Sequence, residues 1–210
     1  MGEKWYVMRR LIYVPIIHTA ADLGSLAEEI EERTKAVFGD ADWQKHKAEV
    51  NLYWQEIYDY WEQKNIPGLK IFQDGMPVEG LAGENIVKSM ANNGSINYKI
   101  VEQLIDKGAK LIQTEDAELL KEEYYLTRDL TKSDPASISP QTLSHYKSRK
   151  DWLLKARDTY IARRIDESLK EGETGVCFLG ASHQILSRLP KTIEVITLKD
   201  PKKVIGKPLL

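Results

Sequence analysis

Two histidines, two carboxylates and one arginine are the residues of this chain whose types and positions could support chemistry. His18 and His183 each lie just beyond a short apolar run, and Asp74 and Glu115 lie just beyond two others. Imidazole and carboxylate groups together either bind a divalent metal or transfer protons, with histidine as the proton acceptor and a carboxylate that orients it. The residue types alone leave both kinds of chemistry open.

The apolar runs that precede these residues are predicted to be strands. They cover residues 11–17, 69–72, 109–113 and 175–179, and a fifth, β-branched run covers residues 193–198. Helical patterns separate them, which is typical of an α/β fold with a central, mostly parallel sheet of about five strands flanked by helices. Because the carboxyl ends of parallel strands meet at one edge, we expect a ligand site there.

The spacing of apolar residues predicts the helices that separate the strands. These helices are expected over residues 22–37, 41–64, 83–90, 95–106 and 142–170. Trp54 and Trp61 share one face of the second helix and are expected in the core rather than in an interface. Residues 132–141, rich in serine and proline, are predicted to be either a plain surface loop or a mobile lid.

Arg157 lies in the last predicted helix, on the same helical stripe as the apolar Ile161. This position favours a side chain that faces the sheet. Its guanidinium would there pair with Asp74 or Glu115, or hold a carboxylate or phosphate of a substrate. The alternative is a surface salt bridge with Asp158 or Asp166.

A metal site would use His18, Asp74 and His183 as ligands, with zinc, manganese or iron as the ion and no other cofactor. The chain has no His-Glu-x-x-His motif and no paired cysteines, so no local signature marks such a site. Its lone Cys177 lies in an apolar run and is expected to be a buried hydrophobic residue. Gly180 is interpreted as the residue that allows a tight turn before His183.

The segments around these residues resemble the TraB/Tiki-like and erythromycin-esterase-like superfamily, which includes ChaN-like proteins. Residues 180–183, Gly-Ala-Ser-His, are similar to the Gly-x-x-His motif that members carry late in the chain, and residues 157–162 are similar to an arginine-containing helical segment. Residues 14–18 keep the histidine of the first family motif, with Pro15 in place of its glycine. Residues 73–75, Gln-Asp-Gly, replace the glutamate and nearby arginine that members carry after the second strand. The resemblance implies an α/β fold with a site built from both histidines, in a group that ranges from metal-dependent peptidases to antibiotic esterases and haem-binding proteins.

Two functions follow as hypotheses. The first is a hydrolase of a small-molecule or peptide substrate, with His18 and His183 as metal ligands or acid–base groups, Asp74 and Glu115 as supporting carboxylates, and Arg157 as a clamp for an anion or transition state. The second is a non-catalytic protein that holds a small ligand or cofactor in the same pocket. This second hypothesis includes a homo-oligomer built on the tryptophan-rich helix of Trp43, Trp54 and Trp61.

The composition bounds these hypotheses. The 210 residues are predicted to form a single α/β domain, residues 1–210, because the length suits one hydrophobic core. A net charge of -2 without a basic cluster argues against nucleic acid and anionic membranes as partners. Residues 1–17 lack the apolar length of a signal peptide or a membrane span, so a cytoplasmic location is expected.

Overall fold

The computed structural model of the protein describes residues 8–19, 22, 32, 35–36, 39–131 and 139–199. Within these ranges, parallel strands alternate with α-helices. The strands are β1 (Arg9–Ile16), β2 (Lys70–Gln73), β3 (Lys110–Ile112), β4 (Thr174–Gly180) and β5 (Ile193–Thr197). The helices are α2 (Asp40–Glu62), α3 (Gly80–Asn92), α4 (Ile96–Asp106), α5 (Ala117–Thr131) and α6 (Pro140–Ser168), with a short 3-10 helix η4 (Leu186–Arg188) before β5.

The five strands form one sheet in the order β3-β2-β4-β1-β5, and every neighbouring pair is parallel. This confirms the predicted α/β fold with a parallel sheet. Gly180 at the end of β4 pairs with Ile16, and Phe178 pairs with Gln73. The carboxyl ends of β1, β2 and β4 therefore lie nearly level at one edge of the sheet.

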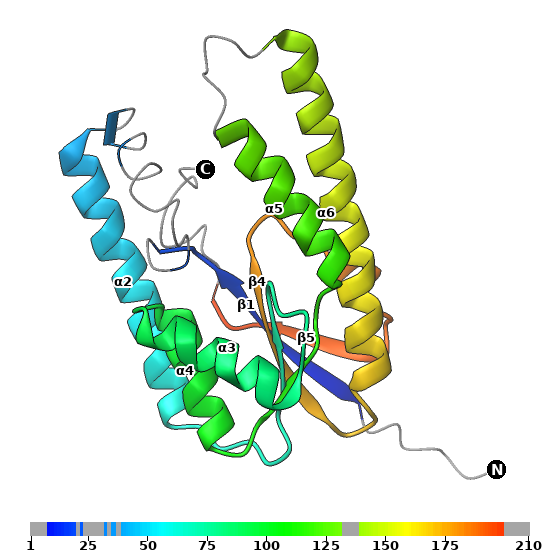
Figure 1. Ribbon diagram of the computed structural model, residues 1–210. Coiled ribbons are helices and arrows are strands. Elements are labelled where there is room, and N and C mark those ends of the chain that lie inside the picture. Colours follow the sequence, from blue (N-terminus) through cyan, green and yellow to red (C-terminus); the bar gives the residue numbers. More distant parts are fainter. Residues whose placement is uncertain are drawn as a thin grey trace.

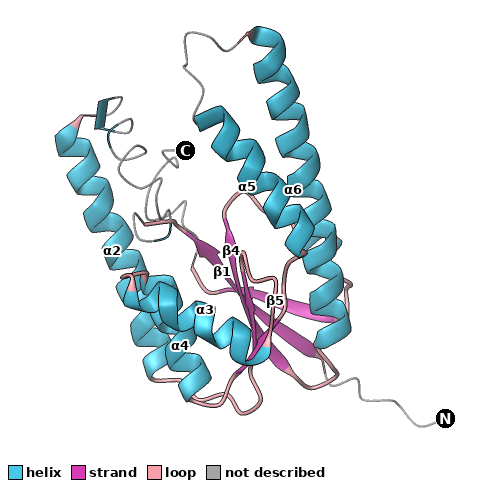
Figure 2. Ribbon diagram, in the orientation of Figure 1, coloured by secondary structure: helices cyan, strands magenta, loops and turns pink. Residues whose placement is uncertain are grey.

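Helices cover both faces of the sheet (Figures 1 and 2). In β1, Ile12 and Val14 belong to a core shared with α2 and α4, whereas Leu11 and Tyr13 belong to a second core shared with α6. This alternation is the period of two that a strand buried on both faces requires. Helix α5 packs against α6, and the two extend together beyond the sheet edge (Figure 1).

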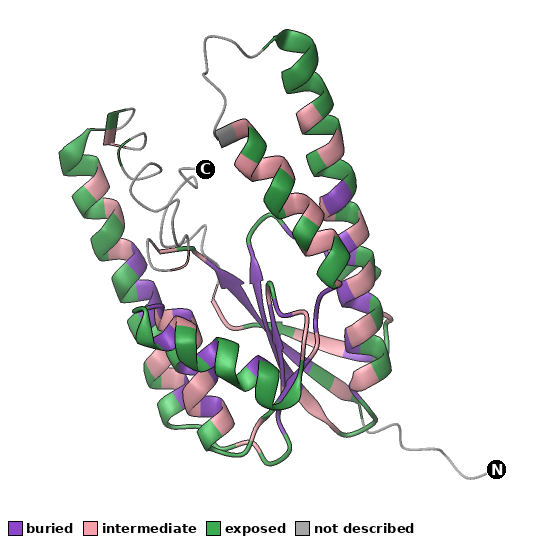
Figure 3. Ribbon diagram, in the orientation of Figure 1, coloured by how far each residue is buried: buried purple, intermediate pink, exposed green. Residues whose placement is uncertain are grey.

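The interior contains the two tryptophans that were predicted to lie in the core. Trp54 and Trp61 are fully buried on α2, and the Trp54 indole donates a 3.0 Å hydrogen bond to the carbonyl of Ile17. Cys177 is also buried, as expected for a small apolar residue of β4. Figure 3 shows how strongly burial concentrates in the strands and in the helix faces that contact them.

The sequence-based prediction missed one helix and misplaced the end of one loop. Two other predicted stretches lie largely outside the residues that the structure describes. Helix α5 was not predicted. Residues 140–141 belong to α6, which begins at Pro140 behind Ser139, whose hydroxyl accepts a 3.1 Å hydrogen bond from the backbone N–H of Thr142. Most of the predicted helix 22–37 and residues 132–138 of the predicted loop lie outside the described residues.

Within the described ranges, no helix combines the length and the apolar character that crossing a membrane requires.

Candidate functional site

His18, Asp74 and His183 converge on Gly180, at the carboxyl end of the central strand β4. A Cβ atom placed on Gly180 would lie 3.1 Å from Oδ2 of Asp74, 3.4 Å from Nε2 of His18 and 3.8 Å from Cδ2 of His183. Three of the predicted site residues therefore surround one point, although they follow three different strands. Gly180 leaves this point free of any side chain.

Asp74 is held in place from two directions. Its backbone N–H donates to the carbonyl of Phe178 at 2.8 Å, which extends the contact between β2 and β4. Its Oδ2 accepts the N–H of Gly180 at 2.8 Å, and its Oδ1 accepts Nη2 of Arg157 at 2.8 Å. Burial disfavours the charged carboxylate, but His183, Arg157 and the Gly180 N–H outweigh it and hold the pKa of Asp74 well below its usual range.

Arg157 lies on the buried stripe of α6, with only 6% of its surface exposed. Its guanidinium forms a fork with Glu115, from Nε to Oε2 at 3.1 Å and from Nη2 to Oε1 at 2.5 Å. The same Nη2 reaches Asp74, and Nη1 donates to Glu123 on α5. Burial alone would lower the pKa of Arg157. The carboxylates outweigh this effect, so the pKa rises above its usual value and the guanidinium stays charged.

Of the two sequence-based alternatives for Arg157, the structure shows pairing with the carboxylates of the site. The guanidinium faces the sheet edge and bonds to both Asp74 and Glu115. Each of its nitrogen atoms already has a carboxylate partner. The geometry therefore suits a residue that positions the carboxylates of the site.

Glu115 follows β3 in the chain and is completely buried. Its backbone N–H, like that of Thr114, donates to the carbonyl of Met76, and this fixes the segment after β3 against the loop after β2. Burial raises the pKa of Glu115, against the opposing effect of Arg157, and the charge of Asp74 raises it further.

His183 is oriented by Asp158, a residue of α6. The imidazole Nδ1 lies 2.6 Å from Oδ1 of Asp158, whose Oδ2 accepts the backbone N–H of Gln184 at 3.0 Å. Nε2 of His183 lies 3.6 Å from Oδ2 of Asp74. Burial lowers the pKa of His183, but Asp158 and Asp74 outweigh it and raise this pKa to about 9.

Asp74, Glu115 and His183 form a group that could hold a metal ion, since each offers a ligand atom within 4.8 Å of the others. Both oxygens of Glu115 are bonded to Arg157, whereas Nε2 of His183 lies 3.6 Å from Oδ2 of Asp74. His18 is exposed and lies outside this group of three, but its Nε2 points to the same place beside Gly180.

Two residues of the cluster, Asp158 and Glu123, were not predicted. A signal for Asp158 was present, because it precedes the buried Ile161, Ala162 and Ile165 at helical spacings of three, four and seven. It was instead considered as a surface partner of its neighbour Arg157. Glu123 could not be assigned, because the prediction did not include α5.

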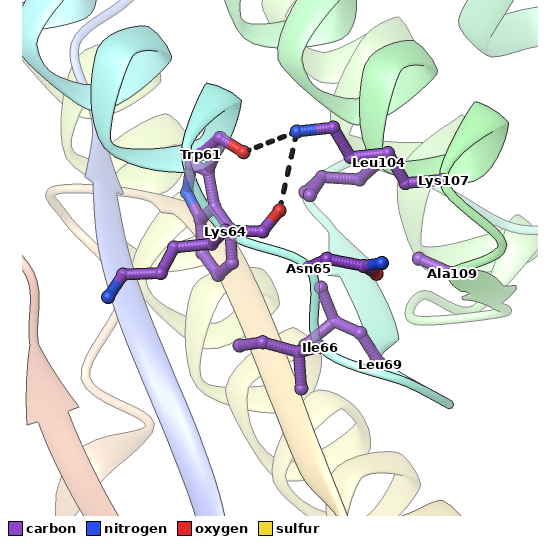
Figure 4. Close-up of a pocket in the computed structure, with 8 residues that line it drawn as sticks. All are labelled: Trp61, Lys64, Asn65, Ile66, Leu69, Leu104, Lys107 and Ala109. Carbon is purple, nitrogen blue, oxygen red and sulfur yellow. Dashed lines mark hydrogen bonds between the residues drawn. The ribbon is translucent and has the colours of Figure 1, made fainter.

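A small cavity lies away from this cluster, at the other end of β2 (Figure 4). The residues that line it are Trp61, Lys64, Asn65, Ile66, Leu69, Leu104, Lys107 and Ala109. The Lys107 ammonium donates to the carbonyls of Trp61 and Lys64, at 2.7 and 3.3 Å, and so satisfies the end of α2. This lysine stabilises the fold, and the lining has no carboxylate or imidazole that could serve the site at the sheet edge.

Comparison with known proteins gave no match, since no family model, no curated protein and no solved structure is similar enough to assign the chain to a family.

Proposed function

We propose that the protein is a hydrolase that acts on a small-molecule or peptide substrate at the edge of the sheet beside Gly180, and that a divalent metal assists it. The observation that carries this proposal is the pairing of His183 with Asp158. Because Asp158 engages Nδ1, the other ring nitrogen, Nε2, faces Asp74 and the point where His18 also converges. A carboxylate–histidine pair of this kind fixes the orientation of metal-binding and proton-transferring histidines.

The donor set fits a divalent metal in chemistry and in charge. His183, Asp74 and His18 would hold it, with imidazole nitrogen and carboxylate oxygen as donors that suit zinc, manganese or iron. The cluster also contains four carboxylates, from Asp74, Glu115, Glu123 and Asp158, against two cations, the guanidinium of Arg157 and the protonated imidazole of His183. This excess of negative charge near the sheet edge favours a bound cation.

The remaining residues support those donors. Arg157 and the N–H of Gly180 each bind one oxygen of Asp74 and so fix its carboxylate plane. Glu115 in turn holds Arg157 through two bonds. A divalent metal would act as a Lewis acid that polarises the oxygen of the scissile group.

The protonation state of His183 separates two forms of this chemistry. With its pKa raised to about 9, metal-free His183 carries a proton on Nε2 at neutral pH and could donate it to a leaving group, whereas His183 as a metal ligand could not be that acid. Binding of a metal at Nε2 requires loss of that proton, so metal uptake should release a proton and strengthen as the pH rises.

The test of the metal is the metal content of purified protein, measured by plasma mass spectrometry after incubation with zinc, manganese and iron salts and removal of the excess. We expect near-stoichiometric metal in the wild type and its loss in His18→Ala and His183→Ala. His145→Ala is the matched control, because His145 is exposed on α6, and it should keep the metal. A folded wild type that binds none of the three ions overturns the metal part of the proposal.

The hydrolase part needs its own assay, with chromogenic ester, amide and phosphoester substrates. We expect turnover to fall by about 100-fold or more in His183→Ala with folding intact, because proton transfer by a positioned side chain contributes on that scale. Ligand-induced stabilisation that depends on His183, without turnover of any of these substrates, would instead favour the non-catalytic binding protein.

A further inference from the structure

His18 is exposed, yet the chain on both sides of it is fixed. Before it, the carbonyl of Ile17 accepts the 3.0 Å hydrogen bond from the indole of Trp54 on α2. After it, the backbone N–H of Thr19 donates to Oδ2 of Asp22 at 2.6 Å. An exposed side chain keeps more rotamer freedom than a buried one, so the place of this imidazole in the site depends on the support of its backbone.

The carboxylate of Asp22 connects the segment that carries His18 to the start of α4. Its Oδ2 accepts both the backbone N–H and the hydroxyl of Thr19, at 2.6 and 2.8 Å. Its Oδ1 accepts the hydroxyl of Ser95. Ser95 in turn caps α4, since its Oγ accepts the backbone N–H of Tyr98 at 3.3 Å. One oxygen of Asp22 therefore closes a local turn, and the other makes a contact across 73 positions of the chain.

The two oxygens of Asp22 separate two interpretations of this residue. The bonds to Thr19 are those of a side chain that closes its own turn, as aspartate commonly does. The bond to Ser95 adds nothing to that turn, because the hydroxyl belongs to another element. Helix α4 is anchored in the core through Ile100 and Leu104, so the bond to Ser95 gives the turn a fixed support.

We infer that Asp22 is a positioning residue for His18, because its carboxylate ties the turn after β1 to Ser95 of α4 and so holds the imidazole beside Gly180. Asp22 acts through the backbone of Thr19 rather than as a ligand. The inference rests on the proposed function only for the purpose of the imidazole, which would there bind the metal. Partners that orient metal ligands in this way typically change metal affinity by about 10- to 100-fold.

The experiment measures nuclear Overhauser effects by NMR in the metal-free, 13C-labelled full chain, between the α-protons of Gly180 and the two imidazole rings. A Cβ atom on Gly180 would lie 3.4 Å from Nε2 of His18 and 3.8 Å from Cδ2 of His183, so the α-proton that points in this direction lies close to both rings. The effect to His183 is the internal control, because Asp158 of α6 holds that ring.

The variants remove the bonds of Asp22 in different ways. Asp22→Ala removes all of them. Ser95→Gly removes only the hydroxyl that joins Asp22 to α4, and glycine costs little stability at an N-cap. Ser139→Gly is the matched control, because it is the same change at the N-cap of α6. Asp22→Asn keeps an acceptor for Thr19 and has an N–H that can bond to Ser95.

We expect the effect between His18 and Gly180 to fall severalfold in Asp22→Ala and Ser95→Gly, to persist in Ser139→Gly and to be largely restored in Asp22→Asn. The effect between His183 and Gly180 should persist in all four variants. An unchanged His18 effect in Ser95→Gly overturns the inference and leaves Asp22 as the cap of its own turn. Equal loss of both effects also overturns it, because the whole sheet edge would then have changed. If Asp22→Ala does not fold, Ser95→Gly decides alone.

This measurement requires neither metal nor turnover, so its outcome is separate from that of the proposed function. Where the wild type binds metal, Asp22→Ala should bind it about tenfold more weakly. A His18 effect that depends on Asp22, in a chain that binds no metal, would leave the positioning role in place and remove the metal. Metal binding with a His18 effect that is independent of Asp22 would do the reverse.

Discussion

Asp158 of α6 and His183, which follows β4, share a contact of 2.6 Å between Oδ1 and Nδ1, and this contact joins the helical layer to the edge of the sheet. The two residues are 25 positions apart in the chain. Both are nearly buried, so the contact is shielded from water. It sets the orientation of the imidazole and contributes to its protonation state.

Replacement of Asp158 by Asn should lower the pKa of His183. The wild-type value is raised to about 9 because Asp158 and Asp74 outweigh burial, and without the Asp158 charge the effect of burial gains weight. The measurement is the pH titration of the His183 ring proton by NMR in metal-free protein. Asp166→Asn, whose carboxylate contacts Arg9, is the control, and an unchanged His183 pKa in Asp158→Asn would contradict the assigned cause.

His183 should also make stability depend on pH. Its pKa is about 9 in the folded protein and about 6.5 when unfolded, so protonation stabilises the folded state. The contribution is fully present below pH ~6.5 and is lost as the pH rises through about 9. The difference in free energy of unfolding between wild type and His183→Gln should therefore shrink over this range in urea titrations. A constant difference would count against the raised pKa, and His145→Gln should show no such trend.

Arg157→Met should destabilise the protein strongly. It removes the cation that pairs with Asp74, Glu115 and Glu123 and leaves buried carboxylates unpaired, which costs about 3–5 kcal/mol. Arg163→Met is the control, because Arg163 is largely exposed and its weak pair with Glu167 spans 3.9 Å. Urea denaturation measures both variants, and equal small losses would show that the Arg157 cluster contributes little.

Gly180→Ala should impair the site more than the fold. The added methyl group would come within 3.1 Å of Oδ2 of Asp74 and 3.4 Å of Nε2 of His18, so these groups have to shift by a few tenths of an ångström. We expect weaker metal retention with only modest loss of stability, measured by dialysis against a chelator and by urea denaturation. Ser182→Ala, at an exposed neighbouring position, should retain metal as the wild type does.

Much of the fold could be predicted from local patterns. The five strands are apolar runs bounded by glycine or polar residues, and their alternation with helices leaves few topologies besides a parallel sheet. Strand order was not accessible in this way, because it depends on which runs become neighbours. Helix α5 was missed because it packs on α6 rather than on the sheet and exposes Tyr124 and Tyr125, which weakens its apolar pattern.

The candidate site shows the same division between local and non-local information. The positions of His18, Asp74 and His183 after strands were sufficient to predict that they come together. The partner of His183 could not be predicted from proximity in sequence, because Asp158 adjoins Arg157 in the chain but bonds to a residue beyond β4. Such pairings are decided by how α6 rotates against the sheet, which single-sequence periodicity leaves open.

The place of β4 between β2 and β1 bears on the order of events during synthesis. Strands β1 and β2 leave the ribosome long before β4, yet within this sheet they contact each other only through it. A nascent chain that ends before Thr174 therefore has the β2–β3 pair and the separate strand β1, with exposed edges, and lacks the point where the site residues meet. The joining of these two parts by β4 and the assembly of the site should thus coincide, late in translation and before β5 is added.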